Sequence, residues 1–151
     1  MANKVETKLI EPLFNAFQKE RIVTISTIDH ETGAPHVTVI SWVYAPDHEH
    51  LYAALDSRSR IVENIKKHPA AVINVFVNES AYSVIGHTYI KMEALNGIPL
   101  KLSLIELKIS EVRDVMFYGS RIKVEPAYEK TYDEKAAAKL DQQVFDAMKK
   151  A

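Results

Sequence analysis

The chain has 151 residues, the usual size of one folded domain with a substantial core. Its 19 Lys and Arg residues nearly balance its 20 Asp and Glu residues, so it lacks the basic excess that nucleic-acid binding requires. Cysteine is absent, which excludes disulfides, thiolate metal ligands and cysteine nucleophiles.

The N-terminal segment carries charges throughout and lacks the continuous apolar core of a secretory signal. No run elsewhere approaches the ~20 apolar residues that span a membrane. These features predict a cytoplasmic protein with neither a membrane nor a nucleic-acid partner. With no linker, repeat or low-complexity segment, we expect a single domain over residues 1–151.

An N-terminal helix is predicted over about residues 5–20. The apolar residues recur at three- and four-residue spacing and so share one helical face: Val5, Leu9, Ile10, Leu13, Phe14 and Phe17. Pro12 falls inside this pattern, and proline removes an amide donor and clashes with the preceding turn. The segment is therefore expected either to kink or to begin its helix near Pro12.

A β-rich stretch follows, and we expect the barrel to occupy about residues 21–119. Residues 21–29, 37–45 and 51–56 read as three successive strands because β-branched residues dominate them. The intervening segments 30–34 and 46–50 read as turns, the first containing Gly33. Three antiparallel strands in succession predict a meander.

The spacing of the apolar residues then changes to that of a short helix within residues 57–69. Ile61, Val62 and Ile65 form its apolar face, and Pro69 ends it. Strands are expected again over residues 70–78, 81–95 and 100–112, with Asn78 and Glu79 near the first turn.

The last predicted element is a helix over about residues 132–150. Thr131 and Glu134 have the spacing of a capping box. Its apolar stripe comprises Ala137, Leu140, Val144 and Met148.

This order of elements favours a mainly β fold with flanking α helices. Connections of two to five residues force neighbouring strands to be antiparallel, which argues against a doubly wound sheet. Closing the sheet would also protect the edges of its strands. We therefore predict an antiparallel split β-barrel.

The strongest local signal for chemistry is the segment Asp56–Arg60, at the boundary between a strand and a helix. Free backbone amides and the positive end of the helix favour an anion there, and two arginines and two hydroxyls could bind a phosphate group. The alternative reading is a solvated helix start with surface arginines, which is common.

Other candidate chemistry is weaker. The six histidines show no metal-binding spacing, so we expect no metal site; they are His30, His36, His48, His50, His68 and His87. No GxSxG motif supports a hydrolase. Trp42, Tyr44 and Tyr52 could stack on a flat aromatic ligand, or could fill the core or a subunit interface.

In order and spacing, residues 21–94 resemble the pyridoxamine 5′-phosphate oxidase-like family of FMN-binding split barrels. The resemblance rests on the opening strand IVTISTID, the GAPHV hairpin exit, the aromatic-rich second strand and the LYAALD third strand. It continues through Ser57, Arg58, Ser59, Arg60, Asn64, Ile65 and Pro69, and then Gly86.

The resemblance implies a homodimer with FMN at the subunit interface. It assigns the phosphate to Ser57, Arg58, Ser59 and Arg60, the flavin ring to Thr38, Val39, Ile40 and Ser41, and the border of the same site to Ala54 and Asp56. Apolar surface on the predicted meander is a second reason to expect a dimer.

Three departures argue against oxidation of pyridoxamine phosphate itself. Ile61 stands where many relatives carry a lysine, and Thr38 stands near an arginine of the true oxidase. The C-terminal segment also lacks the basic, substrate-binding ending of that enzyme.

We therefore expect an FMN-dependent oxidoreductase of unknown substrate, with no side-chain base evident and no catalytic residue assigned. A flavin-binding sensor, carrier or stress protein without turnover is the alternative. A heme-binding split barrel with a histidine ligand is a third reading, and another flavin or a deazaflavin could replace FMN.

Overall fold

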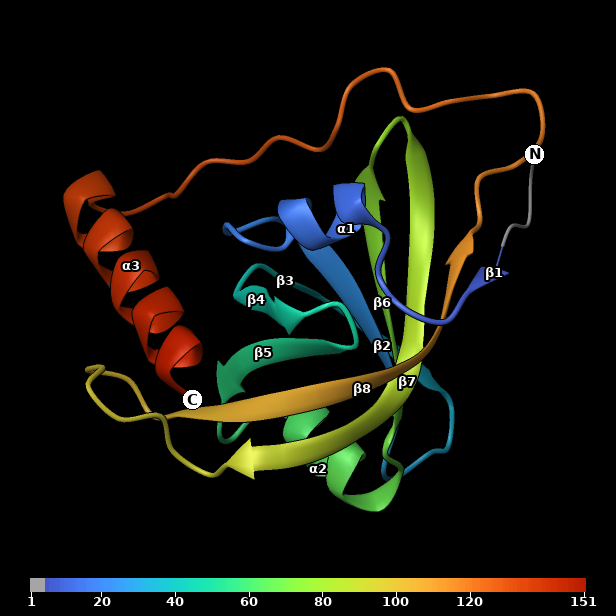
Figure 1. Cartoon of the computed structure of the whole chain (residues 1–151). Coiled ribbons are helices and arrows are strands. Elements are labelled where there is room, and N and C mark those ends of the chain that lie inside the picture. The colour runs from blue at the N-terminus through green and yellow to red at the C-terminus, as the bar shows by residue number, and fades with distance from the viewer. Residues whose placement is uncertain (1–4) are drawn as a thin grey trace.

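The computed structural model of the chain describes residues 5–151 and contains one antiparallel sheet flanked by helices (Figure 1). The strand order is β3-β2-β6-β7-β8-β5-β4, with β1 paired to β8. The elements are β1 (Val5–Glu6), α1 (Glu11–Ala16), β2 (Val23–Ile28), β3 (Pro35–Ile40), β4 (Val43–Asp47), β5 (His50–Asp56), α2 (Arg60–Lys67), β6 (Ala70–Val77), β7 (Ser80–Met92), β8 (Leu102–Asp114) and α3 (Glu134–Lys150).

The two ends of this sheet meet without pairing. β3 and β4 stand at opposite ends of the strand order, yet only residues 41–42 separate them along the chain. A link of that length spans no more than about 11 Å, so the sheet must curl until its ends lie close together. This is the predicted split barrel, and we call the opening between β3 and β4 the seam.

The predicted meander is wrong, because residues 37–45 form two strands rather than one. The Val43 amide donates to the Ser41 carbonyl at 3.0 Å, which makes a tight bend between them. The Ala54 amide donates to the Trp42 carbonyl, so the chain beyond the bend joins β5. β-Branched residues on both sides of the bend concealed it in the sequence.

Both predicted terminal helices need correction. α1 begins at Glu11 and ends at Ala16, with Pro12 in its first turn. Of the two predicted outcomes, a kink or a start near Pro12, the second is the one observed. Val5 and Glu6 instead extend the sheet beside β8. α3 begins at Glu134, and its cap is the side chain of Asp133, which accepts from two backbone amides.

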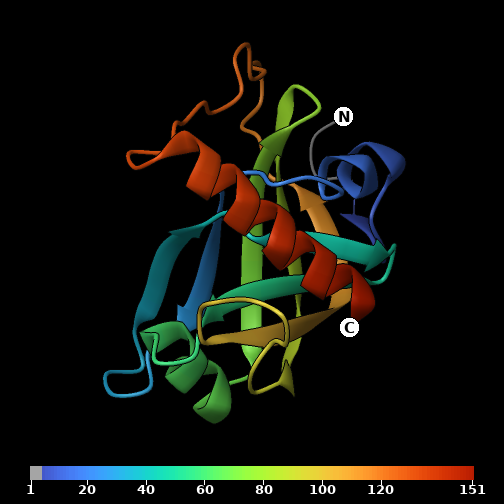
Figure 2. The same cartoon turned by 90° about the vertical axis from the view of Figure 1, so that its left-hand side faces the viewer.

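Two apolar clusters hold the fold together. The larger one fills the barrel, where alternate residues of β2 and β6, such as Ile25 and Ile73, point inward. Leu13 of α1 and Phe17, which follows α1, belong to the same cluster. The smaller one packs α3 against β4, β5 and β8 through residues such as Val144 and Leu104. Figure 2 shows α3 lying diagonally across this side of the sheet.

Two turns lie where the sequence predicted them, and one bulge lies at Gly86, for which no bulge was predicted. Gly33 has a φ of +76° in the β2–β3 hairpin, and Asn78 and Glu79 both have positive φ in the β6–β7 turn. Gly86 lies at a register shift between β7 and β8, where an added Cβ would stand 2.1 Å from the Lys108 carbonyl oxygen.

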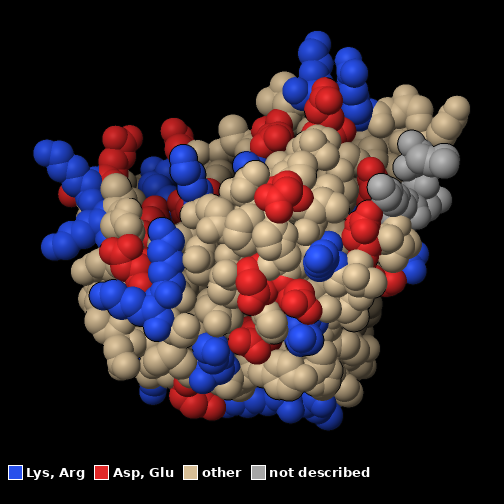
Figure 3. Space-filling view, viewed as in Figure 1, with Lys and Arg blue, Asp and Glu red and all other residues tan. Residues whose placement is uncertain are grey.

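None of the helices that the structure describes is long and apolar enough to cross a membrane. On the face shown in Figure 3, acidic and basic side chains intermingle. This mixture agrees with the near-neutral formal charge of the chain.

Candidate functional site

A hollow of about 260 Å³ opens at the seam. It is bounded by the end of β3, the linker of residues 41–42, the end of β5 and the start of α2. Its lining residues are Thr38, Ile40, Ser41, Trp42, Ala54, Leu55, Asp56, Ser59 and Ile61. We call it the seam pocket.

The fold brings most of the predicted site residues to this one place. Six of the ten line the seam pocket: Thr38, Ile40, Ser41, Ala54, Asp56 and Ser59. Val39 does not, because successive residues of a strand point to opposite faces; its side chain is on the outer face and 59% exposed. Whether these residues hold a ligand stays a prediction.

The turn between β5 and α2 is organised by Asp56. Its Oδ1 accepts from the backbone amide of Arg58 at 2.8 Å and from the Arg58 Nε at 3.4 Å. These bonds lower the pKa of Asp56 and keep its carboxylate charged. Ser57 turns away, since its hydroxyl bonds to the Glu93 and Lys101 carbonyls at the base of the β7–β8 loop.

Ser59 is the most informative residue of the seam pocket. It occupies the cap position of α2, yet its side chain makes no capping bond. Its Oγ is buried and has no hydrogen-bond partner among the described residues. Buried polar atoms are nearly always satisfied, so an unpaired hydroxyl beside the free amides of a helix start suits a ligand oxygen.

The two predicted arginines differ sharply. The Arg58 side chain is 85% exposed, and Asp56 is its one ionic partner within residues 5–151. Arg60 instead binds Asp29 through two nitrogens, one of them 2.9 Å from Oδ2, and lies 3.1 Å from Glu31. The Arg60 guanidinium holds the pKa of Asp29 well below its usual range. Arg60 therefore already ties α2 to the β2–β3 hairpin.

Asn64 strengthens the same tie and is fully buried. Its amide nitrogen donates to the Thr27 Oγ1 at 3.0 Å, and its amide oxygen accepts from the His30 backbone amide at 2.8 Å. The family resemblance included Asn64 without revealing this role. Satisfied buried amides of this kind fix one arrangement of packed elements.

Three residues that line the seam pocket were not among the predicted site residues. Trp42 was named only as a stacking candidate, Ile61 only for the helix face and as a departure from the family, and Leu55 only as part of the third strand. Glu20 and Asp141, which hold Ser41 and Trp42, had no sequence signal either, because they lie far from the linker along the chain.

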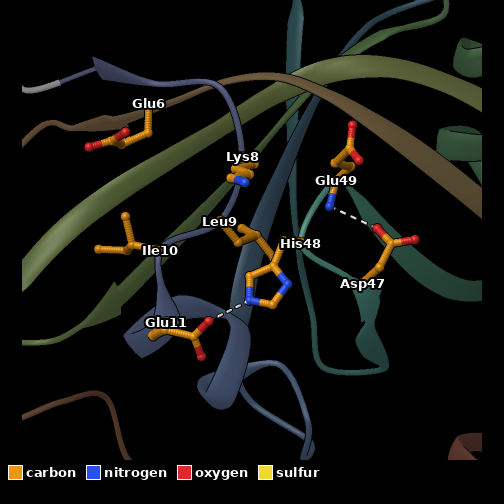
Figure 4. Close-up of a pocket in the computed structure, with 8 residues that line it drawn as sticks. All are labelled: Glu6, Lys8, Leu9, Ile10, Glu11, Asp47, His48 and Glu49. Atoms are coloured by element: carbon orange, nitrogen blue, oxygen red, sulfur yellow. Dashed lines mark hydrogen bonds and ion pairs between the residues drawn. The ribbon is translucent and has the colours of Figure 1, made fainter.

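A second, larger hollow of about 580 Å³ lies near β1, α1 and the β4–β5 turn, and Figure 4 shows its residues. Glu6, Glu11, Asp47 and Glu49 make it acidic. Its His48 stacks on Phe14 and bonds to Glu11 at 2.7 Å. Among residues 5–151, no group of three or more His, Asp or Glu is arranged to hold a metal.

Comparison with known proteins gives one family. The sequence profile described as pyridoxamine 5′-phosphate oxidase matches residues 10–116. No curated protein matches the chain.

Solved structures share the fold at low identity. A candidate pyridoxamine 5′-phosphate oxidase from Lactobacillus delbrueckii is 21% identical, with a TM-score of 0.63 over 74% of this chain and 98% of its own. General stress protein 26 from Bacillus anthracis is 16% identical, with a TM-score of 0.53 over 65% and 86%. A heme-binding protein from Mycobacterium smegmatis is 14% identical, with a TM-score of 0.53 over 70% and 52%. At these identities the likeness extends to the fold alone.

Proposed function

The chain belongs to the pyridoxamine 5′-phosphate oxidase family, and on that premise we propose that it binds FMN in the seam pocket and acts as an FMN-dependent oxidoreductase. The observation that carries the proposal is the buried, unpaired Ser59 hydroxyl at the start of α2. A hydroxyl there would give the mainly apolar hollow an anion-binding end, which would match the polarity of a flavin nucleotide.

The residues present fit each end of FMN. The first amides of α2, the Ser59 hydroxyl and the exposed cation of Arg58 would hold the phosphate. The exposed ion pair between Arg58 and Asp56 is weak and could yield to a phosphate. Ile40, Trp42 and Ala54 would border the flavin ring through apolar contact.

The size of the seam pocket supports a homodimer. Its volume of about 260 Å³ is just below the ~300–1,000 Å³ of small-molecule sites, so a second chain would have to enclose the rest of the ligand. The outer face of the adjoining sheet offers the surface for it. Val37 and Val39 of β3 and Phe76 of β6 point outward there and are 61%, 59% and 43% exposed.

Bound FMN would supply hydride transfer, while the protein binds and orients it. Asp56 is the one ionisable residue among the described residues that line the seam pocket. This scarcity of acid and base groups suits hydride exchange between a donor and an acceptor. The same scarcity equally suits the alternative, a flavin-binding protein without turnover. Among the described residues, no histidine lines the seam pocket as a heme ligand.

The first test is titration with FMN and with riboflavin, which lacks the phosphate. Ser59→Ala and Arg58→Ala should each lower FMN affinity by about ten- to a hundredfold, the effect of one charge-assisted bond, and leave riboflavin affinity unchanged. Arg121→Ala is the matched control, because Arg121 is 80% exposed and pairs with Glu79. Failure of the wild-type protein to take up FMN, or equal losses for both ligands, would contradict the proposal.

Turnover is tested separately. Anaerobic addition of NADH or NADPH to the FMN-loaded protein should bleach the flavin absorbance, and an added acceptor should restore it. A flavin that stays oxidised with every donor would instead favour the carrier or sensor function.

A further inference from the structure

Two carboxylates and one ammonium from three distant segments meet beside the seam. The Lys130 Nζ lies 2.7 Å from Glu20 Oε2 and 3.2 Å from Asp141 Oδ1. Glu20 precedes β2, Lys130 belongs to the long segment that connects β8 to α3, and Asp141 lies on α3. Figure 1 shows that connecting segment passing over the barrel to reach α3. We call these residues the bracing triad.

Each carboxylate of the triad also holds one residue of the linker. The Ser41 hydroxyl donates to Glu20 Oε2 at 2.6 Å, and the Trp42 indole Nε1 donates to Asp141 Oδ1 at 2.9 Å. Ser41 and Trp42 are consecutive, they bridge the seam, and both line the seam pocket. The position of this wall therefore depends on the triad.

The triad is shielded from solvent, which strengthens its bonds. The side chains of Glu20, Lys130 and Asp141 are only 16%, 25% and 18% exposed. Burial works against the charged ammonium, but the bonds to both carboxylates outweigh it and raise the pKa of Lys130. Burial and the neighbouring Glu20 carboxylate raise the pKa of Tyr128 to about 12, so its phenol stays neutral.

Docking of α3 does not require the triad. Ala137, Val144 and Met148 are buried, and the apolar cluster that α3 forms with the sheet already fixes the helix. Removal of Lys130 would leave two carboxylates facing each other without their shared cation, and repulsion between them would move the linker. The bonds of the bracing triad are separate from the apolar contacts that dock α3. This separation indicates that the triad has a role in shaping the seam pocket.

We propose that Lys130 is a positioning residue of the ligand pocket: by bridging Glu20 and Asp141 it fixes Ser41 and Trp42 as the wall against which a flat ring packs. The inference rests on the proposed function for the identity of that ring. It gives the C-terminal segment, which lies beyond the family match at residue 116, an indirect part in ring binding.

The single tryptophan of the chain, Trp42, makes the inference testable without any ligand. Lys130→Met should make Trp42 emission shift to the red and roughly double its quenching by acrylamide, because a ring released from its partner is more accessible to water. Lys130→Arg keeps a cation that can bond both carboxylates and should restore wild-type emission. Lys135→Met on the exposed face of α3 is the matched control.

The ligand arm uses FMN and riboflavin, each alone. Lys130→Met should weaken both by a similar factor of about ten, because the triad acts on the ring and not on the phosphate. Lys130→Arg should recover the affinity. Changed Trp42 emission with both affinities unchanged would mean that the triad only supports the fold, and the inference would be overturned.

Failure of the proposed function has a different signature. If the wild-type protein binds neither ligand while Lys130→Met changes Trp42 emission, FMN binding is wrong and the triad still positions the wall. Unchanged emission in Lys130→Met overturns the inference whatever FMN does. If Lys130→Met fails to fold, Glu20→Gln carries the same measurements, because it removes a charged partner of Lys130 and leaves the bond between Trp42 and Asp141 in place. Glu129→Gln, at an exposed position of the connecting segment, is its control.

Discussion

The two walls of the seam pocket are held in different ways. The α2 wall is tied to the β2–β3 hairpin by Arg60 and Asn64, across sequence separations of 31 and 37 residues. The linker wall is held by Asp141 and by the Lys130 bridge, across separations of 99 and 110 residues. The first wall lies inside the family match and the second depends on residues beyond it. The contacts of the α2 wall thus lie wholly within the matched region, whereas the linker wall also depends on Lys130 and Asp141 outside it.

Breaking the α2 wall should cost the most stability. Asn64→Ala removes an amide that is fully buried and leaves Thr27 and the His30 amide without their partner. We expect a loss of about 2–4 kcal/mol in the free energy of unfolding, since both a cavity and unsatisfied polar groups result. Urea denaturation followed by circular dichroism measures it.

The control for this prediction is Asn96→Ala, because Asn96 is exposed in the β7–β8 loop. It should change stability by less than ~0.5 kcal/mol. A comparable loss in both variants would show that Asn64 has no special role in fixing α2.

The ion pair of the α2 wall should appear as a pH dependence. Because the pKa of Asp29 is depressed in the folded state, its contribution to stability is present above the unfolded value of about 3.9 and is lost as pH falls below it. Asp29→Asn should therefore lower the melting temperature at neutral pH and lose less on acidification than the wild-type protein does.

Melting curves recorded at about pH 7 and about pH 3 test this, and the gap between the two proteins should narrow at the lower pH. Asp146→Asn, on the exposed face of α3, should track the wild-type protein at both. A gap that is constant with pH would remove Asp29 from the acid response.

The same contrast explains what the sequence could predict. The α2 wall is a contiguous motif at a strand-to-helix boundary, so its residues were found together. The order of the elements and the short connections between strands indicated a split barrel. The bend at Ser41 and Trp42 was hidden among β-branched residues, and the meander prediction failed there. Glu20, Lys130 and Asp141 carry no shared pattern, because only the completed fold brings them together. Arg60 was predicted as a phosphate ligand, and no sequence pattern indicated that Asp29 would bind it instead.

The smallest effects are expected within the linker wall. They test whether the bonds that hold Ser41 and Trp42 are energetically coupled. Ser41→Ala and Trp42→Phe each remove one bond to a carboxylate that keeps Lys130 as partner, so each should cost only ~0.5–1.5 kcal/mol in urea unfolding. If Lys130 couples the two halves, the double variant should deviate from the sum of the single ones by at least ~0.5 kcal/mol. Additivity within ~0.3 kcal/mol would mean that Glu20 and Asp141 hold their linker residues independently. Repeating the cycle in Lys130→Met should abolish the coupling, since that variant removes the shared cation and leaves both linker residues in place.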